Sequence, residues 1–214
     1  MTTIIKINFW LATFLVLFNG LAGAQSDLDS LKHTAETAEQ ETERLRAYID
    51  LSRMIHRIDP NDPEDLYYAE LAVNQSQEFG DTLLWAESLD NMGLLHRFHS
   101  RFGQAIPFHR QALELVREKP VDAYFKMRFA NNVGVAARYD GAFDMAVEHY
   151  LYALKIAEQE DDLRNIAIAS NGLGNSFSQI EGNEEAALSY YLKALEVEKQ
   201  RENGLGMAMN YLSI

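Results

Sequence analysis

Cysteine is absent from this 214-residue chain, and proline is rare. Without cysteine the sequence offers no disulfide, no thiolate nucleophile, no cysteine-ligated zinc and no lipidated cysteine as a membrane anchor. The four prolines all lie between Pro60 and Pro120, which leaves long stretches free for helix. Alanine, leucine and glutamate dominate those stretches, so the composition favours an all-helical fold.

Positive charge is also scarce. The formal net charge is −13, and no two lysine or arginine residues stand next to each other. A nucleic-acid-binding surface needs clustered positive charge, so this segment is not expected to bind nucleic acid. The hydrophobic content of 47% argues against intrinsic disorder.

Long apolar runs are missing except at the start of the chain. Lys6 precedes the run Ile7 to Phe18, and Ala22-Gly23-Ala24 follows it. The run is shorter than the roughly 20 residues that cross a bilayer, and it is typical of a secretory signal peptide. We predict a signal peptide over residues 1–24 with cleavage before Gln25, the alternative being an uncleaved signal anchor. The mature protein would then be exported, either to the periplasm or to the periplasmic side of the inner membrane.

A repeat of about forty residues organises the remainder. Gly93, Gly134 and Gly174 lie 41 and 40 residues apart in similar settings. Alanines keep the same period, with spacings of 40, 41 and 41, at Ala72, Ala112, Ala153 and Ala194. A mid-helix glycine costs about 1 kcal/mol relative to alanine, so its recurrence predicts a close crossing between paired helices.

Turn and capping residues divide the repeats into helical hairpins. Asp62 before Pro63 is predicted to cap a helix, and Phe79-Gly80-Asp81 is predicted to form a turn. Pro107 predicts a kink or a late helix start. The predicted helix pairs are 41–58 with 63–79, 82–99 with 103–118, 122–139 with 143–159, and 163–180 with 184–201, after a leading helix within 26–40.

This pattern resembles the tetratricopeptide repeat in an extended form, since the usual period is about 34 residues. The copy that carries the resemblance best has Val133-Gly134, Tyr139, Phe143, Ala146, Tyr150 and Ala153-Leu154. The resemblance implies a right-handed α-solenoid of helical hairpins. It divides the chain into a leading segment, 25–40, and a repeat domain, 41–214, with repeats at about 41–80, 81–120, 121–161, 162–202 and a partial one at 203–214.

The layout of the chain carries a second resemblance. A signal peptide, then Asp29-Ser-Leu-Lys32, then forty-residue repeats is similar to the sensor region of histidine kinases and related regulators in Bacteroidetes-type bacteria. This resemblance implies two-component signal transduction, with a membrane anchor and an output domain beyond Ile214, where the fifth hairpin is unfinished. A free-standing periplasmic adaptor for envelope protein assembly is the alternative.

Candidate catalytic and metal residues have simpler interpretations. His96, His99 and His109 have helical spacing that could suit a metal, but His96 occupies a repeat position that usually holds a packing aromatic. Gly172-Leu173-Gly174 follows a helix, not a strand, and is the repeat glycine instead of a dinucleotide loop. The acidic run from Glu158 to Asp162 is interpreted as a solvated loop. We expect no enzyme activity, cofactor or metal in this segment.

Binding is therefore assigned to the concave face, which the first helix of each hairpin lines in this family. Amide and guanidinium groups there can bind a peptide backbone or a carboxylate. Ordinary solvated polar residues are the alternative. The candidate site residues are Arg57, Arg97, Asn131, Arg138, Asn171, Asn175 and Asn210. The tyrosine and phenylalanine stripe at Tyr139, Phe143, Tyr150 and Tyr190 is assigned to the core.

Overall fold

The computed structural model describes residues 26–214, which form two compact units that divide between Gln75 and Ser76. The predicted signal peptide, 1–24, lies outside the described residues. The described part of the chain is helical and contains no β-strand. Within 26–214, no helix is both long enough and apolar enough to span a membrane.

The first unit consists of a helix over residues 26–37, α2 (Glu41–Ile58) and most of α3 (Glu64–Phe79). Its small core contains Ala35, Ala47 and Leu51. The predicted cap before α3 is confirmed, because the backbone N–H of Glu64 donates to Oδ1 of Asp62 at 2.9 Å.

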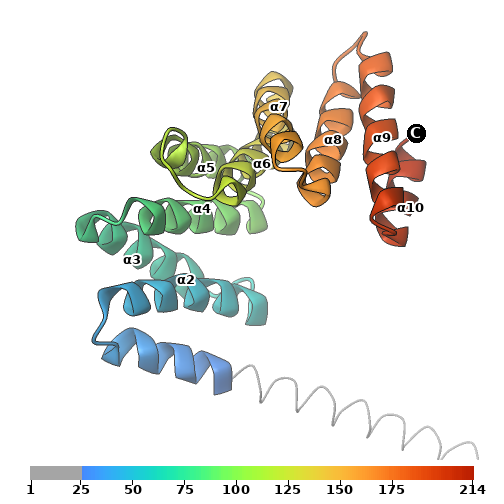
Figure 1. The fold of residues 1–214 in the computed structure, drawn as a ribbon. Coiled ribbons are helices and arrows are strands. Elements are labelled where there is room, and N and C mark those ends of the chain that lie inside the picture. The colour runs from blue at the N-terminus through green and yellow to red at the C-terminus, as the bar shows by residue number, and fades with distance from the viewer. Residues whose placement is uncertain (1–25) are drawn as a thin grey trace, which may run out of the picture. The chain divides into compact units, whose positions relative to one another are not determined.

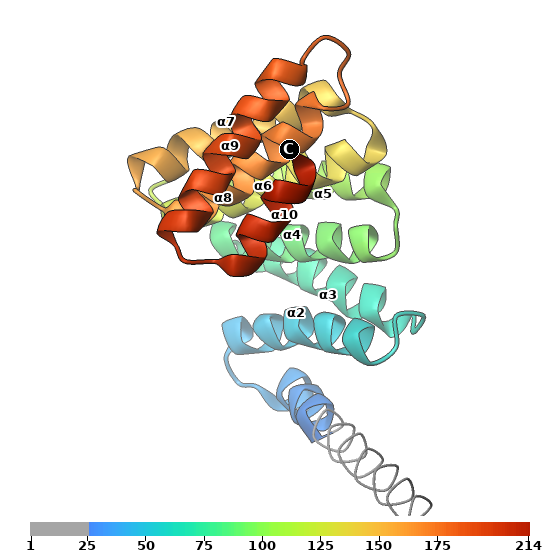
Figure 2. The ribbon, with the colours of Figure 1, turned by 90° about the vertical axis from the view of Figure 1, so that its right-hand side faces the viewer.

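The second unit continues with helices that pair into hairpins (Figures 1 and 2). Helix α4 packs on α5, α6 on α7 and α8 on α9, while α10 packs against α9. These elements are α4 (Thr82–Phe98), α5 (Phe102–Val116), α6 (Ala123–Asp140), α7 (Phe143–Gln159), α8 (Leu163–Phe177), α9 (Glu184–Gln200) and α10 (Gly204–Ser213). Consecutive hairpins contact each other through α5 with α6 and α7 with α8, so the fold is the predicted all-α stack of hairpins.

Four side-chain caps recur in phase with the repeat. Asp81, Asp122, Asp162 and Asn203 stand 41, 40 and 41 residues apart, directly before α4, α6, α8 and α10. Each side chain accepts a backbone N–H from the first turn of the helix that follows. Asp162 lies in the predicted loop between α7 and α8, and there it also caps α8.

The repeat glycines make room for rings from the partner helices. A Cβ atom added to Gly134 would lie 2.8 Å from the ring of Tyr150, and one added to Gly172 would lie 2.5 Å from the same ring. Gly93 meets the ring of His109 in the same way, and Gly174 meets Tyr191. The predicted close crossings are confirmed.

Three sequence predictions about individual residues need correction. Tyr139 was predicted to lie in the core, but it is 57% exposed. Its ring stacks on that of Phe102 at the surface, with ring centroids 4.9 Å apart. In the following hairpin, Tyr191 fills the core position, while Tyr190 is only half-buried. Helix α5 begins at Phe102 and runs through Pro107, so the predicted late start is wrong.

Candidate functional site

A fully buried carboxylate, Asp90 on α4, connects the hairpin of α4 and α5 with α6 of the next hairpin. Its Oδ1 atom lies 2.7 Å from Nδ1 of His109 and accepts a hydrogen bond of 2.9 Å from Nδ2 of Asn132. Its Oδ2 atom lies 3.3 Å from Nε of Arg128. Burial alone would raise the pKa of Asp90, but these partners together lower it. Sequence reasoning missed Asp90 and Asn132.

Two of the three candidate metal histidines, His96 and His109, take part in packing or ion pairing. His96 stacks on Phe108, with ring centroids 5.2 Å apart, as a packing aromatic would. His109 is completely buried against Gly93 and paired with Asp90. Its place in the repeat corresponds to that of Tyr150. The pair of His109 and Asp90 could have been suspected from the sequence, because a histidine at a core position of the repeat needs a polar partner when it is buried.

Two of the predicted site residues are partly buried arginines that form no salt bridge with a carboxylate among residues 26–214, although the charge of Asp90 acts on Arg97. Arg97 donates from NH1 to Oδ1 of Asn132 at 2.9 Å, and burial lowers its pKa. Arg138 lies over the ring of Tyr139 at 4.2 Å. Burial alone would lower the pKa of Arg138, but its interactions with the hydroxyls of Tyr139 and Tyr150 raise it. The positive charge of Arg138 lies close enough to Arg97 to contribute to the lowering of the Arg97 pKa.

Three of the predicted asparagines form a hydrogen-bonded chain, which we name the amide ladder: Asn175, Asn171 and Asn210. Nδ2 of Asn175 donates to Oδ1 of Asn171 at 2.7 Å, and Nδ2 of Asn171 donates to Oδ1 of Asn210 at 3.1 Å. The ladder joins α8 to α10. The hydroxyl of Tyr191 donates to Oδ1 of Asn175 at 3.0 Å and so fixes the orientation of the first amide. Each amide carries two N–H bonds, so the partly exposed Asn171 and Asn175 each keep one for a ligand while their orientation is fixed.

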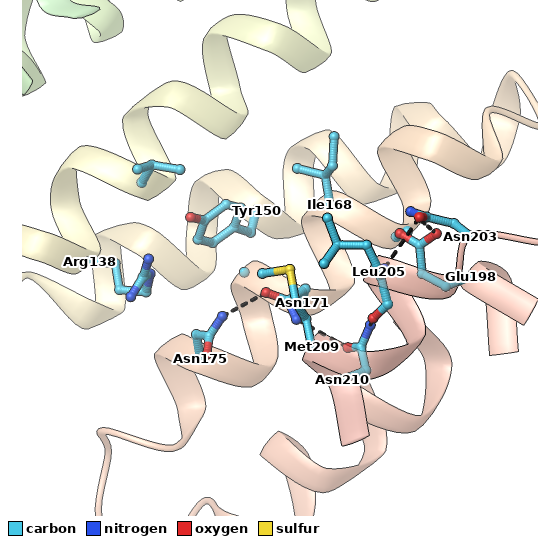
Figure 3. Close-up of a pocket in the computed structure, with 14 residues that line it drawn as sticks. Arg138, Tyr150, Ile168, Asn171, Asn175, Glu198, Asn203, Leu205, Met209 and Asn210 are labelled. Carbon is cyan, nitrogen blue, oxygen red and sulfur yellow. Dashed lines mark hydrogen bonds between the residues drawn. The ribbon is translucent and has the colours of Figure 1, made fainter. Parts of the chain in front are cut away.

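The amide ladder and Arg138 line a single pocket of about 300 Å³ (Figure 3). Arg138 and Asn175 lie at one end, where the hydroxyl of Tyr150 points toward the guanidinium group. Burial raises the pKa of Tyr150, so its hydroxyl stays protonated and remains a donor. Toward the other end, Ile168, Leu205 and Met209 form apolar walls, and the polar side chains of Glu198 and Asn203 lie beyond Leu205.

The structure thus brings four of the seven predicted site residues together: Arg138, Asn171, Asn175 and Asn210. Asn131 lies elsewhere in the second unit, buried, with Nδ2 3.4 Å from Oδ1 of Asn165. Arg97 lines no part of this pocket. Arg57 belongs to the first unit and is exposed in the last turn of α2.

Comparison with known families identifies the central part of this architecture. The family model described as tetratricopeptide repeat matches residues 127–200. This stretch is similar to the tetratricopeptide repeat. It spans nearly all of α6 together with α7, α8 and α9, and so includes Arg138 and two of the three residues of the amide ladder. No curated protein sequence matches the chain.

Several solved structures have the same helical fold as this chain. BtubC (BKLC) from P. vanneervenii is similar with a TM-score of 0.70 and 16% identity, over 90% of this chain and 82% of that chain. PlcR of Bacillus thuringiensis, solved in complex with the peptide PapR7 and DNA, gives a TM-score of 0.68 at 12% identity, over 91% and 70%.

A third similar structure is the signal transduction ATPase PH0952 from Pyrococcus horikoshii, a protein with a tetratricopeptide repeat sensor. Its TM-score is 0.67 at 17% identity, and the match covers 89% of this chain but only 30% of that one. The predicted fold class, an α-solenoid of tetratricopeptide-like hairpins, is confirmed.

Proposed function

We propose that the second unit binds a peptide or an extended protein segment, and that the pocket lined by Arg138 and the amide ladder anchors it. The observation that carries this proposal is the convergence in one pocket of a phenolic hydroxyl, three fixed amides and a guanidinium group that has no carboxylate partner within 26–214. Such groups bind carboxylates and peptide bonds strongly, because the donors are already oriented before the ligand arrives.

The similar structures support a binding role of this kind. PlcR was solved with a peptide bound. Stacked helical hairpins of this kind form extended binding surfaces. We therefore propose a non-catalytic scaffold that takes a protein or peptide partner.

The finer proposal is that this scaffold is the exported, sensory part of a larger membrane signalling protein of the histidine kinase type, anchored through a further segment. The leader pattern at residues 6–24 and the layout of the repeats support it. PH0952, a signal transduction ATPase, has a sensor made of tetratricopeptide repeats, which is a precedent for such a role. A periplasmic adaptor for envelope assembly is the second candidate, supported by the same leader pattern.

Replacing Arg138 by alanine tests the binding proposal. A random heptapeptide library displayed on phage is selected on the intact protein, and the recovered peptides are synthesised and titrated by fluorescence anisotropy. Arg138→Ala should weaken their binding about tenfold or more, since a charge-assisted hydrogen bond contributes about 1.5–3 kcal/mol. Arg97→Ala should add to this loss, because its positive charge lies close to Arg138.

Arg164 provides the matched control, because it is an exposed arginine on α8 that does not line the pocket. Arg164→Ala should bind the same peptides as the unaltered protein does. Equal affinity of the Arg138→Ala variant, with its circular dichroism unchanged, would remove the pocket from the binding site. Failure to recover any peptide would count against the binding proposal as a whole.

A further inference from the structure

The apolar end of the pocket is lined by exposed apolar side chains. Leu205 is 75% exposed, Met209 56% and Ile168 42%. All three line the same cavity. Grouped apolar side chains of this kind on a protein surface mark an interaction site more often than scattered ones do.

Apart from Glu198, no charged side chain lines this end of the pocket. The segment 204–214 contains no charged residue, although 24% of the chain is charged. Glu198 is the only carboxylate among the lining residues, and it is already engaged. Its Oε2 accepts hydrogen bonds from NH1 of Arg201 at 2.7 Å and from Nδ2 of Asn203 at 2.9 Å. A ligand therefore meets an apolar wall here, while it meets a cation at Arg138.

The polar walls limit what the rest of the ligand can contribute. Each amide of the ladder already makes hydrogen bonds within the protein, and Asn210 also donates from Nδ2 to the backbone oxygen of Gly206 at 2.9 Å. The free hydrogen-bonding positions of the amides suit the peptide backbone. Because every peptide has the same backbone, these contacts do not distinguish one peptide sequence from another. Selection must come from the two ends of the pocket.

We propose that Ile168, Leu205 and Met209 form a subsite for a large apolar side chain of the peptide, and that this side chain lies within a few residues of the carboxylate bound at Arg138. This inference rests on the proposed peptide binding and names the class of peptide. The occupant is an acidic segment with an apolar anchor, not a second copy of this chain, because the pocket combines its apolar wall with a cation that seeks a negative charge.

The volume agrees with such an occupant. A pocket of about 300 Å³ is at the lower end of the range for ligand sites. It has room for a side chain or two from an extended segment, and a helix of a folded partner would not enter it.

The test is a double-mutant cycle between the pocket and a defined peptide. The probe is a heptapeptide recovered from the phage library, in which an acidic residue and a leucine, isoleucine, methionine or phenylalanine should lie within about three positions. Exchange of that apolar residue for alanine, and Met209→Ser in the protein, should each weaken binding about tenfold, as expected when a buried apolar side chain is lost. The two losses should not add, because both changes remove the same contact.

Leu192→Ser is the matched control, since Leu192 is 49% exposed on α9 and lies outside the pocket. Binding that depends on Arg138 but tolerates Met209→Ser would overturn this inference and leave the proposed function intact. Recovery of no peptide at all would contradict both. Sedimentation that shows a dimer dispersed by Leu205→Ser would assign the apolar end to self-association and would also overturn it.

Discussion

Tyr150 connects the packing of the second unit with its pocket. Its ring is held between Gly134 and Gly172, and only 1% of the residue is exposed, while its hydroxyl faces Arg138. The position of that hydroxyl therefore depends on the absence of side chains at two glycines. A residue-scale packing feature thus determines the geometry of the candidate site.

Substitution of Gly172 tests this dependence. In Gly172→Ala the new methyl group would lie 2.5 Å from a ring that cannot retreat, so the variant should lose about 1–3 kcal/mol of unfolding free energy despite alanine's higher helix propensity. Urea denaturation followed by circular dichroism measures the loss. Gly204→Ala is the control, because a Cβ there meets no heavy atom within 4 Å, and it should be neutral or stabilising. Equal stability of both variants would mean that the Tyr150 ring has room to move.

The buried charge of Asp90 should contribute to the stability of the second unit. Asp90→Asn removes the buried charge that pairs with Arg128 and lies 2.7 Å from Nδ1 of His109, and should cost about 3 kcal/mol at neutral pH because Arg128 loses its counter-charge. The folded-state pKa of Asp90 is lowered, so its charge contributes stability above about pH 4, the ordinary carboxyl value, and this contribution disappears as the pH falls through the folded-state pKa.

Urea titrations at a series of pH values measure this effect. The stability difference between the unaltered protein and Asp90→Asn should be full at pH 6 and should shrink in acid. Asp144→Asn, at an exposed position on α7, should change stability by less than about 1 kcal/mol. A difference that stays constant down to strongly acidic pH would show that Asp90 is not charged in the folded protein.

Helices and their boundaries were largely predictable from the sequence because they depend on local signals. The forty-residue period and the turn residues placed the helices within a few residues of where they lie. The pocket was predictable only in part. Repeat position identified Asn171 and Asn210, but Asn132 and Asp90 depend on which side chains meet when hairpins close, and the apolar contribution of Met209 depends on how α10 packs. No local pattern encodes these contacts.

Each recurring cap should stabilise the helix that it precedes, and Asp81 before α4 is the case to test. Asp81 accepts two backbone N–H groups at the start of α4, at 3.0 Å each. Asp81→Ala should therefore cost about 1 kcal/mol of unfolding free energy, measured by urea denaturation. Asp81→Asn should retain most of the stability, because an asparagine oxygen can accept the same bonds. A loss as large for Asn as for Ala would point to charge, and not capping geometry, as the source of the effect.

The predicted leader, if it directs export, would decide which partners the pocket can meet. An exported protein encounters envelope proteins and extracellular peptides, whereas a retained one does not. Residues 1–40 fused to alkaline phosphatase, an enzyme that needs disulfides and is active only after export from the reducing cytoplasm, should give high activity. Leu15→Arg interrupts the apolar run between Ile7 and Phe18 and should abolish that activity.

Leu31→Arg is the matched control in the same fusion, because it places the same charge after the predicted cleavage position, and it should leave activity unchanged. Mass spectrometry of the exported fusion should find Gln25 at its new N-terminus; a retained leader would instead support the signal anchor. An inactive but abundant fusion with the native leader would contradict export. The sensor and the periplasmic adaptor would then both be excluded, because each requires the pocket to lie outside the cytoplasm.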